Sequence, residues 1–219
     1  MRLIEAIKHQ GSPFEIPDAV RDDLPAFFRE MGYKTGVEIG VYKGDFTNQF
    51  CQQGLKVYGV DPWAVYEDYQ TTPQYASKKW KELQDRQDFL YGHTQRTLAK
   101  YLESGQATLV RKSSMEAVKN FEDDSLDFVF IDGHHGFKYV AEDLWEWTKK
   151  VRGGGIISGH DFHDYHNPRL DPYCIHVRYV VEAYTKALRI YTWYVIGTTK
   201  KVPGERRERW RSWFWLKTE

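Results

Sequence analysis

Apolar positions along the chain fall into short continuous runs separated by longer amphipathic stretches. Five short runs, rich in β-branched and aromatic residues, predict buried strands at 34–39, 56–60, 107–111, 126–131 and 156–158. Helical patterns occupy the intervals, at 45–53, from 73 to about 103, at 115–121 and at 137–151. Because strands alternate with helices, the pattern predicts an α/β fold built on a doubly wound parallel sheet.

Both ends of the chain add to this core. Residues 17–31 predict a leading helix, and a helix at about 175–187 precedes two closely spaced strands at 188–192 and 194–199, expected as an antiparallel pair at one edge. We therefore predict one domain over residues 1–219, comprising a helical lead-in, a cofactor-binding core and a basic aromatic tail, at 1–33, 34–200 and 201–219. The tail is expected to pack on the sheet with its arginine stems in solvent, and a contact surface for a partner or an anionic substrate is the alternative.

Composition narrows the setting. The chain carries 31 basic and 31 acidic residues, so no global field draws in nucleic acid or an anionic membrane. No window approaches 18 uninterrupted apolar residues, and the N-terminus lacks a signal-peptide core. Cys51 and Cys174 form no metal-binding spacing and are expected to be reduced thiols. These features predict a cytoplasmic protein.

A glycine turn follows the first predicted strand. Glu38, Gly40 and Gly44 form the pattern Glu-x-Gly-x-x-x-Gly, which allows a tight turn and close approach of a ligand to the helix start. Asp61 ends the second strand, where an acid can accept hydrogen bonds from ribose hydroxyls. Tyr42 stands where a dinucleotide fingerprint has its second glycine, and it would block a pyrophosphate. The turn predicts a nucleotide-like cofactor other than a dinucleotide.

Histidines and aspartates follow the fourth and fifth predicted strands. Asp132, His134 and His135 come after the fourth, and His160 and Asp161 after the fifth. Adjacent strand ends lie only ~5 Å apart, so Asp132, His160 and Asp161 could share one cation. Carboxylates suit Mg, Ca or Mn, and an imidazole shifts the preference toward Mn, Fe or Zn. A histidine here could also act as a base near neutral pH.

Four segments together resemble class I S-adenosylmethionine-dependent methyltransferases, and the closest branch contains macrolide-sugar and other small-molecule O-methyltransferases. The resemblance covers about residues 34–200 and is carried by 37–44, 58–63, 130–135 and 153–162. It implies a Rossmann-like methyltransferase fold, with a doubly wound, mostly parallel seven-stranded sheet and an antiparallel C-terminal strand. It also implies S-adenosyl-L-methionine as cofactor and methyl transfer to a hydroxyl of a sugar or other small molecule.

The resemblance assigns cofactor-binding roles from the methionine end of the cofactor to its adenine. Glu38, Gly40 and Gly44 would surround the methionine part, and Asp132 would lie near the transferable methyl. The remaining assignments place Asp61 on the ribose hydroxyls, Trp63 at the cofactor rim, and Ser114 and Met115 beside the adenine.

The same resemblance implies a metal site and a base. In metal-dependent relatives, an acid equivalent to Asp132 binds a divalent cation, here Mg or Mn, together with an acidic pair at His160 and Asp161. The first member of that pair is a histidine in this chain, a departure that leaves both metal dependence and metal identity open. A base lies two or three positions after the first acid, which makes His134 or His135 the candidate. The catalytic set is therefore His134, His135 and Asp161.

Two other classes remain open from the sequence: a His/Asp metal-dependent hydrolase or oxygenase, and a catalytically silent cofactor-fold protein that interacts through its tail. For the methyltransferase we expect a small-molecule acceptor, glycosylated or aromatic. A homodimer would be consistent with exposed aromatic residues. The acceptor pocket is expected to draw on aromatic residues of the insertion at 63–91 and of the loop after Asp161, namely Tyr66, Tyr69, Tyr75, Trp80, Tyr165 and Tyr173.

Overall fold

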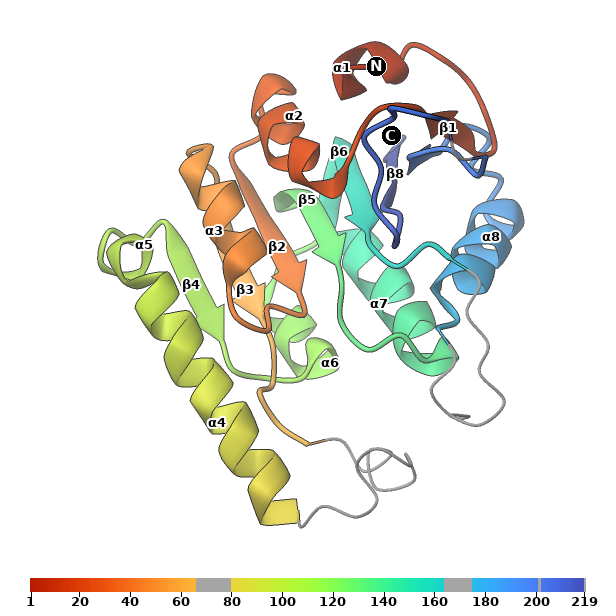
Figure 1. Cartoon of the computed structure of the whole chain (residues 1–219). Coiled ribbons are helices and arrows are strands. Elements are labelled where there is room, and N and C mark those ends of the chain that lie inside the picture. Colours follow the sequence, from red (N-terminus) through yellow and green to blue (C-terminus); the bar gives the residue numbers. More distant parts are fainter. Residues whose placement is uncertain (66–79, 164–174, 201, 219) are drawn as a thin grey trace.

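One eight-stranded sheet organises the chain in the computed structural model, which describes residues 1–65, 80–163, 175–200 and 202–218. The strand order is β1-β7-β8-β6-β5-β2-β3-β4 (Figure 1). The strands are β1 (Phe14–Ile16), β2 (Thr35–Ile39), β3 (Lys56–Val60), β4 (Ala107–Val110), β5 (Leu126–Ile131), β6 (Val151–Gly159), β7 (Tyr194–Ile196) and β8 (Trp213–Leu216). All neighbouring pairs are parallel except those of β8 with β6 and β7. The predicted fold class is confirmed. The sheet has eight strands rather than seven, and β1 and β8 lie outside the ranges in which strands were expected.

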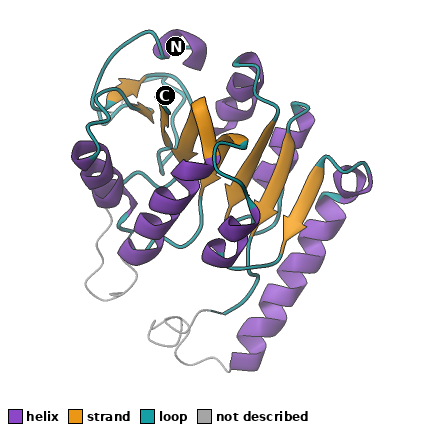
Figure 2. Ribbon diagram, turned by 180° about the vertical axis from the view of Figure 1, so that it is seen from behind, coloured by secondary structure: helices purple, strands orange, loops and turns teal. Residues whose placement is uncertain are grey.

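Helices cover both faces of this sheet (Figures 1 and 2). They are α1 (Leu3–Ala6), η1 (Arg21–Asp23), α2 (Leu24–Glu30), α3 (Asp45–Gln52), α4 (Trp80–Thr97), α5 (Ala99–Glu103), α6 (Ser114–Ala117), η3 (Val118–Asn120), α7 (Phe137–Lys150) and α8 (Val177–Ala187). Residues of α1, α2, α3 and α5 pack into one core cluster, while η3, α7 and α8 belong to the other. Among the described helices, none combines the length and the apolar character that a membrane crossing needs.

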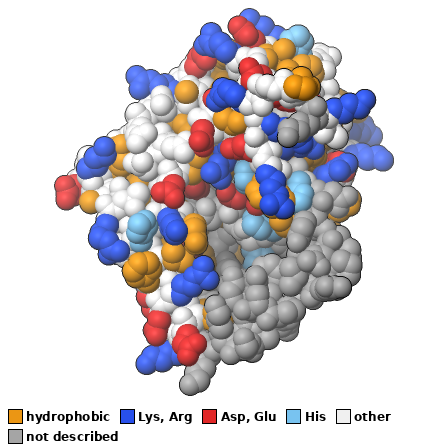
Figure 3. Space-filling model, in the orientation of Figure 1, with side chains coloured by type: hydrophobic (Ala, Val, Ile, Leu, Met, Phe, Trp, Pro, Cys, Tyr) orange, Lys and Arg blue, Asp and Glu red, His pale blue; other side chains and the backbone are white. Residues whose placement is uncertain are grey.

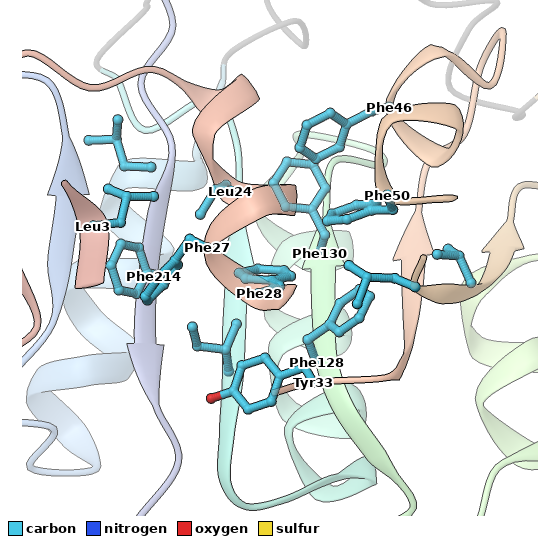
Figure 4. Packing of buried hydrophobic residues seen from close by; sticks show 14 of the residues in the cluster. Leu3, Leu24, Phe27, Phe28, Tyr33, Phe46, Phe50, Phe128, Phe130 and Phe214 are labelled. Atoms are coloured by element: carbon cyan, nitrogen blue, oxygen red, sulfur yellow. The ribbon is translucent and has the colours of Figure 1, made fainter. Parts of the chain in front are cut away.

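Aromatic rings fill the core under α2 and α3 (Figure 4). Phe28 of α2 is fully buried and lies with its ring centroid 5.6 Å from that of Phe50 and 4.9 Å from that of Phe128. Phe46 and Phe130 continue the row, with centroids 4.5 Å apart. Because such rings remove large apolar areas from water, this row fixes α2 and α3 on β5.

One strand predicted from the sequence does not form, and one predicted helix boundary is wrong. No strand forms at 188–192: Leu188 caps α8, and both Leu188 and Tyr191 are exposed, so the edge pairing of β7 comes from β1 instead. The helix predicted to 151 ends at Lys150, and β6 begins at once and runs through the glycines. A Cβ on Gly155 would lie 2.5 Å from the backbone oxygen of Asp127, so the glycine serves the close β5–β6 pairing rather than a helix stop.

The aromatic part of the C-terminal tail lies inside the sheet. β8 inserts between β6 and β7, and Trp213, Phe214 and Trp215 are all buried. The ring of Phe214 lies 4.8 Å from that of Tyr194 and 5.6 Å from that of Phe27. The end of the chain therefore closes the gap between two strands that lie far apart in the sequence.

Replacing Phe214 with Ala should lower the free energy of unfolding by about 3–5 kcal/mol, because it removes a fully buried ring and leaves a cavity. Urea denaturation measures the change. Phe89, which is 65% exposed on α4, provides the control, and its alanine variant should stay within about 0.5 kcal/mol of the unchanged protein. Equal effects of the two substitutions would contradict the central position of β8.

Candidate active site

A cavity of about 650 Å³ opens at the carboxyl ends of β2, β3 and β5. Its wall also includes residues of α4, α6 and α7. In Figure 3, acidic, basic and histidine side chains gather near the centre of the visible face. Ligands of open α/β sheets bind outside the carboxyl ends of the strands, so this cavity occupies the expected place.

The glycine turn brings the ends of β2 and β5 into direct contact. Gly40 has φ +88°, and a Cβ there would lie 2.1 Å from the backbone oxygen of Asp132. The Asp132 N–H donates to the Ile39 carbonyl at 2.8 Å. Only glycine permits this approach, so Gly40 places Asp132 beside the turn and both on the cavity wall.

Asp61 holds the turn from the neighbouring strand. One carboxylate oxygen accepts the N–H groups of Val41 and Tyr42 at 3.1 and 3.0 Å, and the other accepts the N–H of Trp63 at 2.7 Å. Burial raises the pKa of Asp61, and these three hydrogen bonds oppose that rise. A carboxylate has about four acceptor positions, so Asp61, which lines the cavity, keeps room for a ligand hydroxyl.

Trp63 and Gly44 lie behind the turn rather than among the described residues of the cavity wall. Trp63 is 1% exposed, packs with Val41 and Leu90, and donates its indole N–H to the Tyr42 carbonyl at 3.0 Å. A Cβ on Gly44 would lie 3.0 Å from Thr94 Cγ2. The structure thus has Trp63 buried beside the cavity wall, and its role at the cofactor rim stays a prediction. Both residues support the turn through packing.

Glu38 lies at the bottom of the cavity. Its side chain is 2% exposed and accepts a hydrogen bond from the Thr47 hydroxyl. Burial raises the pKa of Glu38 to about 8, although the Thr47 hydrogen bond lowers it. The carboxyl therefore keeps its proton near neutral pH unless a cationic group approaches.

Ser114, another residue of the cavity wall, belongs to a chain of hydrogen-bonded polar side chains. Its hydroxyl donates to Asp143 of α7 and accepts the Trp147 indole N–H at 2.7 Å. Burial raises the pKa of Asp143 to about 7. Ser114, Met115 and Asp143 all line the cavity. Asp143 was not predictable from the sequence, because an acid within an amphipathic helix looks like any solvent-facing residue.

A His-Asp cluster lies beside the cavity. Asp132, His135 and Asp161 place one potential ligand atom each within 4.8 Å of one another. His135 Nε2 is 2.7 Å from Asp161 Oδ2 and 3.8 Å from Asp132 Oδ1. Burial lowers the pKa of His135, but the two carboxylates outweigh it and raise the value to about 10. Burial opposes ionisation of Asp161 too, yet His135 and His160 hold its pKa below the usual range.

His160 contacts the same carboxylates from β6. Its Nδ1 lies 3.8 Å from Asp132 Oδ1 and 3.4 Å from Asp161 Oδ1. Asp132, His160 and Asp161, the three metal ligands predicted from the sequence, therefore come together, and His135 joins them. Asp132, His135 and Asp161 have the separations of atoms that can ligate one ion, and His160 lies beside this group. The donor set fits a divalent cation.

The two candidate bases have different surroundings. His135 faces the carboxylates, whereas His134 Nδ1 accepts the Gly136 N–H at 3.0 Å and its ring lies 4.1 Å from that of Tyr139. Both line the cavity. The structure thus separates two histidines that the sequence left equivalent, and only His135 belongs to the cluster.

Arg21 of η1 is a cavity residue that the sequence analysis did not single out. Its Nη1 lies 3.4 Å from Asp132 Oδ2, and its guanidinium lies 4.8 Å over the Phe46 ring. Nothing in the predicted lead-in helix marked Arg21, because its contact partner is 111 positions away. Of the aromatic residues expected around an acceptor, Tyr66, Tyr69, Tyr75, Tyr165 and Tyr173 lie outside the described residues, and Trp80 is described only as the first residue of α4.

The sheet order, the glycine turn at the end of β2 and the acid at the end of β3 define a class I methyltransferase fold. The sequence model of the family described as "Methyltransferase domain" matches residues 37–162, which is more than half of the chain. The chain belongs to this methyltransferase domain family. This membership favours a methyltransferase over the hydrolase, the oxygenase and the silent protein.

Two solved structures share this fold, and one further protein is similar in sequence. The O-methyltransferase from Bacillus cereus in complex with SAH has a TM-score of 0.56 at 13% identity, over 90% of this chain and 80% of that one. The O-methyltransferase TomG from Streptomyces achromogenes, in complex with SAM, has a TM-score of 0.57 at 11% identity, over 90% and 78%. The uncharacterized protein y4gI of Sinorhizobium fredii is 27% identical over 131 residues, a stretch that is 57% of this chain but only 13% of that protein.

The raised pKa of Glu38 predicts a pH-dependent stability. The folded protein retains the Glu38 proton between pH 4.5 and about 8, whereas the unfolded chain releases it near 4.5. The contribution of the retained Glu38 proton to the free energy of unfolding is therefore complete below pH 4.5 and is lost as the pH rises toward 8. Glu38→Gln should remove this loss, so urea denaturation should show the variant gaining stability relative to the unchanged protein from pH 5 to 8. Glu103→Gln, at an exposed position, is the control and should follow the pH profile of the unchanged protein. If the stability of Glu38→Gln followed that same profile, the raised pKa of Glu38 would be contradicted.

Proposed function

We propose that this methyltransferase transfers a methyl group to a hydroxyl of a sugar or another small molecule, assisted by a divalent cation. One observation carries the proposal: Asp132 and His135 line the cofactor-sized cavity and also belong to the His-Asp cluster. A hydroxyl group bound at the cluster would therefore lie next to the cavity, close to Asp132 and His135. The cytoplasmic location and the homodimer expected from the sequence belong to the same proposal.

The cavity wall supports binding of S-adenosylmethionine in one direction. Glu38 and Arg21 give the wall an acid and a cation that interact electrostatically, which suits the ammonium and carboxylate of an amino acid. Asp61 would accept the ribose hydroxyls, and Ser114 and Met115 would flank the adenine at the opposite end. When bound, the cofactor supplies a sulfonium whose methyl group is electrophilic.

Asp132, Asp161 and His160 would hold the cation. A bound cation acts as a Lewis acid that lowers the pKa of a coordinated hydroxyl. Two carboxylates with an imidazole suit Mn better than Mg, because Mg strongly prefers oxygen ligands. Asp132 would also orient the acceptor oxygen toward the methyl group.

His135 would receive the acceptor proton. Its Nε2 faces Asp132 and Asp161, so the imidazolium that forms is stabilised by two carboxylates. The same carboxylates favour the protonated form of the ring. A cation bound by these carboxylates would offset their negative charge, and the neutral imidazole could then act as a base. Asp161 would serve as an electrostatic partner of His135 in addition to its role as ligand.

The function is tested in two steps. Calorimetric titration with S-adenosylhomocysteine should show saturable binding, and failure to bind would overturn the cofactor assignment. Incubation with S-adenosylmethionine and a panel of glycosides, catechols and simple alcohols, followed by mass spectrometry, should then give products heavier by one methylene unit. Chelation of divalent cations should abolish the product and Mn²⁺ should restore it. Activity that survives chelation would remove the metal from the proposal and leave the methyl transfer.

His135→Gln should lower kcat by about 10²–10⁴-fold, the usual contribution of a general base. The affinity for S-adenosylhomocysteine should change little, since the substitution removes no charge from the cofactor-binding end of the cavity. His134→Gln is the matched control and should retain most of the activity. If His134→Gln proved the more damaging of the two, the base would be His134.

Arg21→Ala should weaken S-adenosylhomocysteine binding by about 10- to 100-fold, because a charge-assisted hydrogen bond to a carboxylate contributes about 1.5–3 kcal/mol. Calorimetry measures the change. Arg29→Ala, which removes a guanidinium bonded only to the Gln53 carbonyl among the described residues, should leave the affinity unchanged. An unchanged affinity in Arg21→Ala would place the cofactor carboxylate elsewhere.

A further inference from the structure

The segment that leads into β8 (residues 202–212, the C-terminal segment) packs against the loop after β6. The Phe162 N–H donates to the Arg211 carbonyl at 2.8 Å, and the Trp213 indole N–H donates to the His160 carbonyl at 3.1 Å. The ring of Trp210 lies 3.9 Å from that of His163. These contacts fix the backbone on both sides of Asp161 to the end of the chain.

Glu208 of this segment reaches the far edge of the His160 ring. Its Oε2 lies 3.7 Å from His160 Nε2, an ion-pair distance longer than a hydrogen bond. The oxygen is buried, and no described residue donates a hydrogen bond to it. The His160 side chain is 11% exposed, so its ring is enclosed between Glu208 on one edge and Asp132 and Asp161 on the other.

We propose that Glu208 is a positioning residue that orients His160 as a metal ligand through Nδ1. The proposal rests on the metal site of the proposed function. A carboxylate that accepts Nε2–H leaves the lone pair on Nδ1, fixes the ring orientation and makes the imidazole a stronger ligand. Glu208 also adds a negative charge to a site in which an imidazole contributes none.

Direct metal binding tests this role without an assay of activity. The protein is titrated with Mn²⁺ in the presence of saturating S-adenosylhomocysteine, and free Mn²⁺ is followed by its electron paramagnetic resonance signal. Binding should be about 10- to 100-fold weaker in Glu208→Gln, the usual cost of losing such a partner. Glu208→Asp, which keeps the charge, should recover part of the affinity. S-adenosylhomocysteine affinity should stay the same in both variants.

Glu205→Gln is the matched control. Glu205 is a carboxylate of the same segment that accepts the Asp18 N–H at 3.2 Å and the Thr198 hydroxyl, and it anchors the segment away from the cluster. Its substitution should leave Mn²⁺ affinity unchanged. A comparable loss in Glu205→Gln would mean that any loosening of the segment weakens the site, and the specific role of Glu208 would fall.

Co²⁺ binding distinguishes a specific role of Glu208 from general loosening of the C-terminal segment. Its visible absorption reports ligand geometry, so Glu208→Gln should shift the band toward that of His160→Ala, whereas Glu205→Gln should keep the original spectrum. Unchanged Mn²⁺ affinity and Co²⁺ spectrum in Glu208→Gln would overturn the positioning role and leave the metal site intact. If the unchanged protein binds S-adenosylhomocysteine but neither metal, the metal part of the proposed function fails, and the role of Glu208 fails with it.

Discussion

The contact between Gly40 and the backbone of Asp132 is the constraint on which the site depends. A side chain at Gly40 would meet the Asp132 carbonyl at 2.1 Å, so the ends of β2 and β5 can touch only because this residue is glycine. The contact gives the cofactor cavity and the His-Asp cluster a common wall. Without it, Glu38 and Asp61 on one side and Asp132 and His135 on the other would belong to separate sites.

Burial raises the pKa of every acid discussed here, and their neighbours decide whether the net shift is upward or downward. Glu38 and Asp143 are buried next to hydroxyl groups, which donate hydrogen bonds but carry no charge, and the pKa of each is raised. Asp161 is buried next to two histidines and its pKa is lowered. The surroundings therefore favour the protonated form of Glu38 in the cavity and the ionised form of Asp161 in the cluster.

The sequence predicted the parts of the fold that depend on local pattern. Apolar runs located the strands of the core, and Asp132 and Asp161 were recognisable because an acid directly after a buried strand is costly unless it is used. The residues it missed, Arg21, Asp143 and Glu208, act through partners 29 to 111 positions away, and their own surroundings look like solvent-exposed helix or tail. The false strand at 188–192 has the same origin: its apolar residues fit a strand locally, but β1 and β8 already pair with β7.

The position of the C-terminal segment follows from topology. β8 runs antiparallel to β6, with Trp213 opposite Gly159, so the start of β8 lies at the carboxyl end of β6. The residues that precede β8 must then cross the edge of the sheet where His160 and Asp161 lie. A parallel strand in the same place would enter from the opposite edge and leave the cluster uncovered. The aromatic rings of β8 thus complete the core. Because β8 runs antiparallel to β6, the residues before it pass the cluster, and Glu208 lies beside His160.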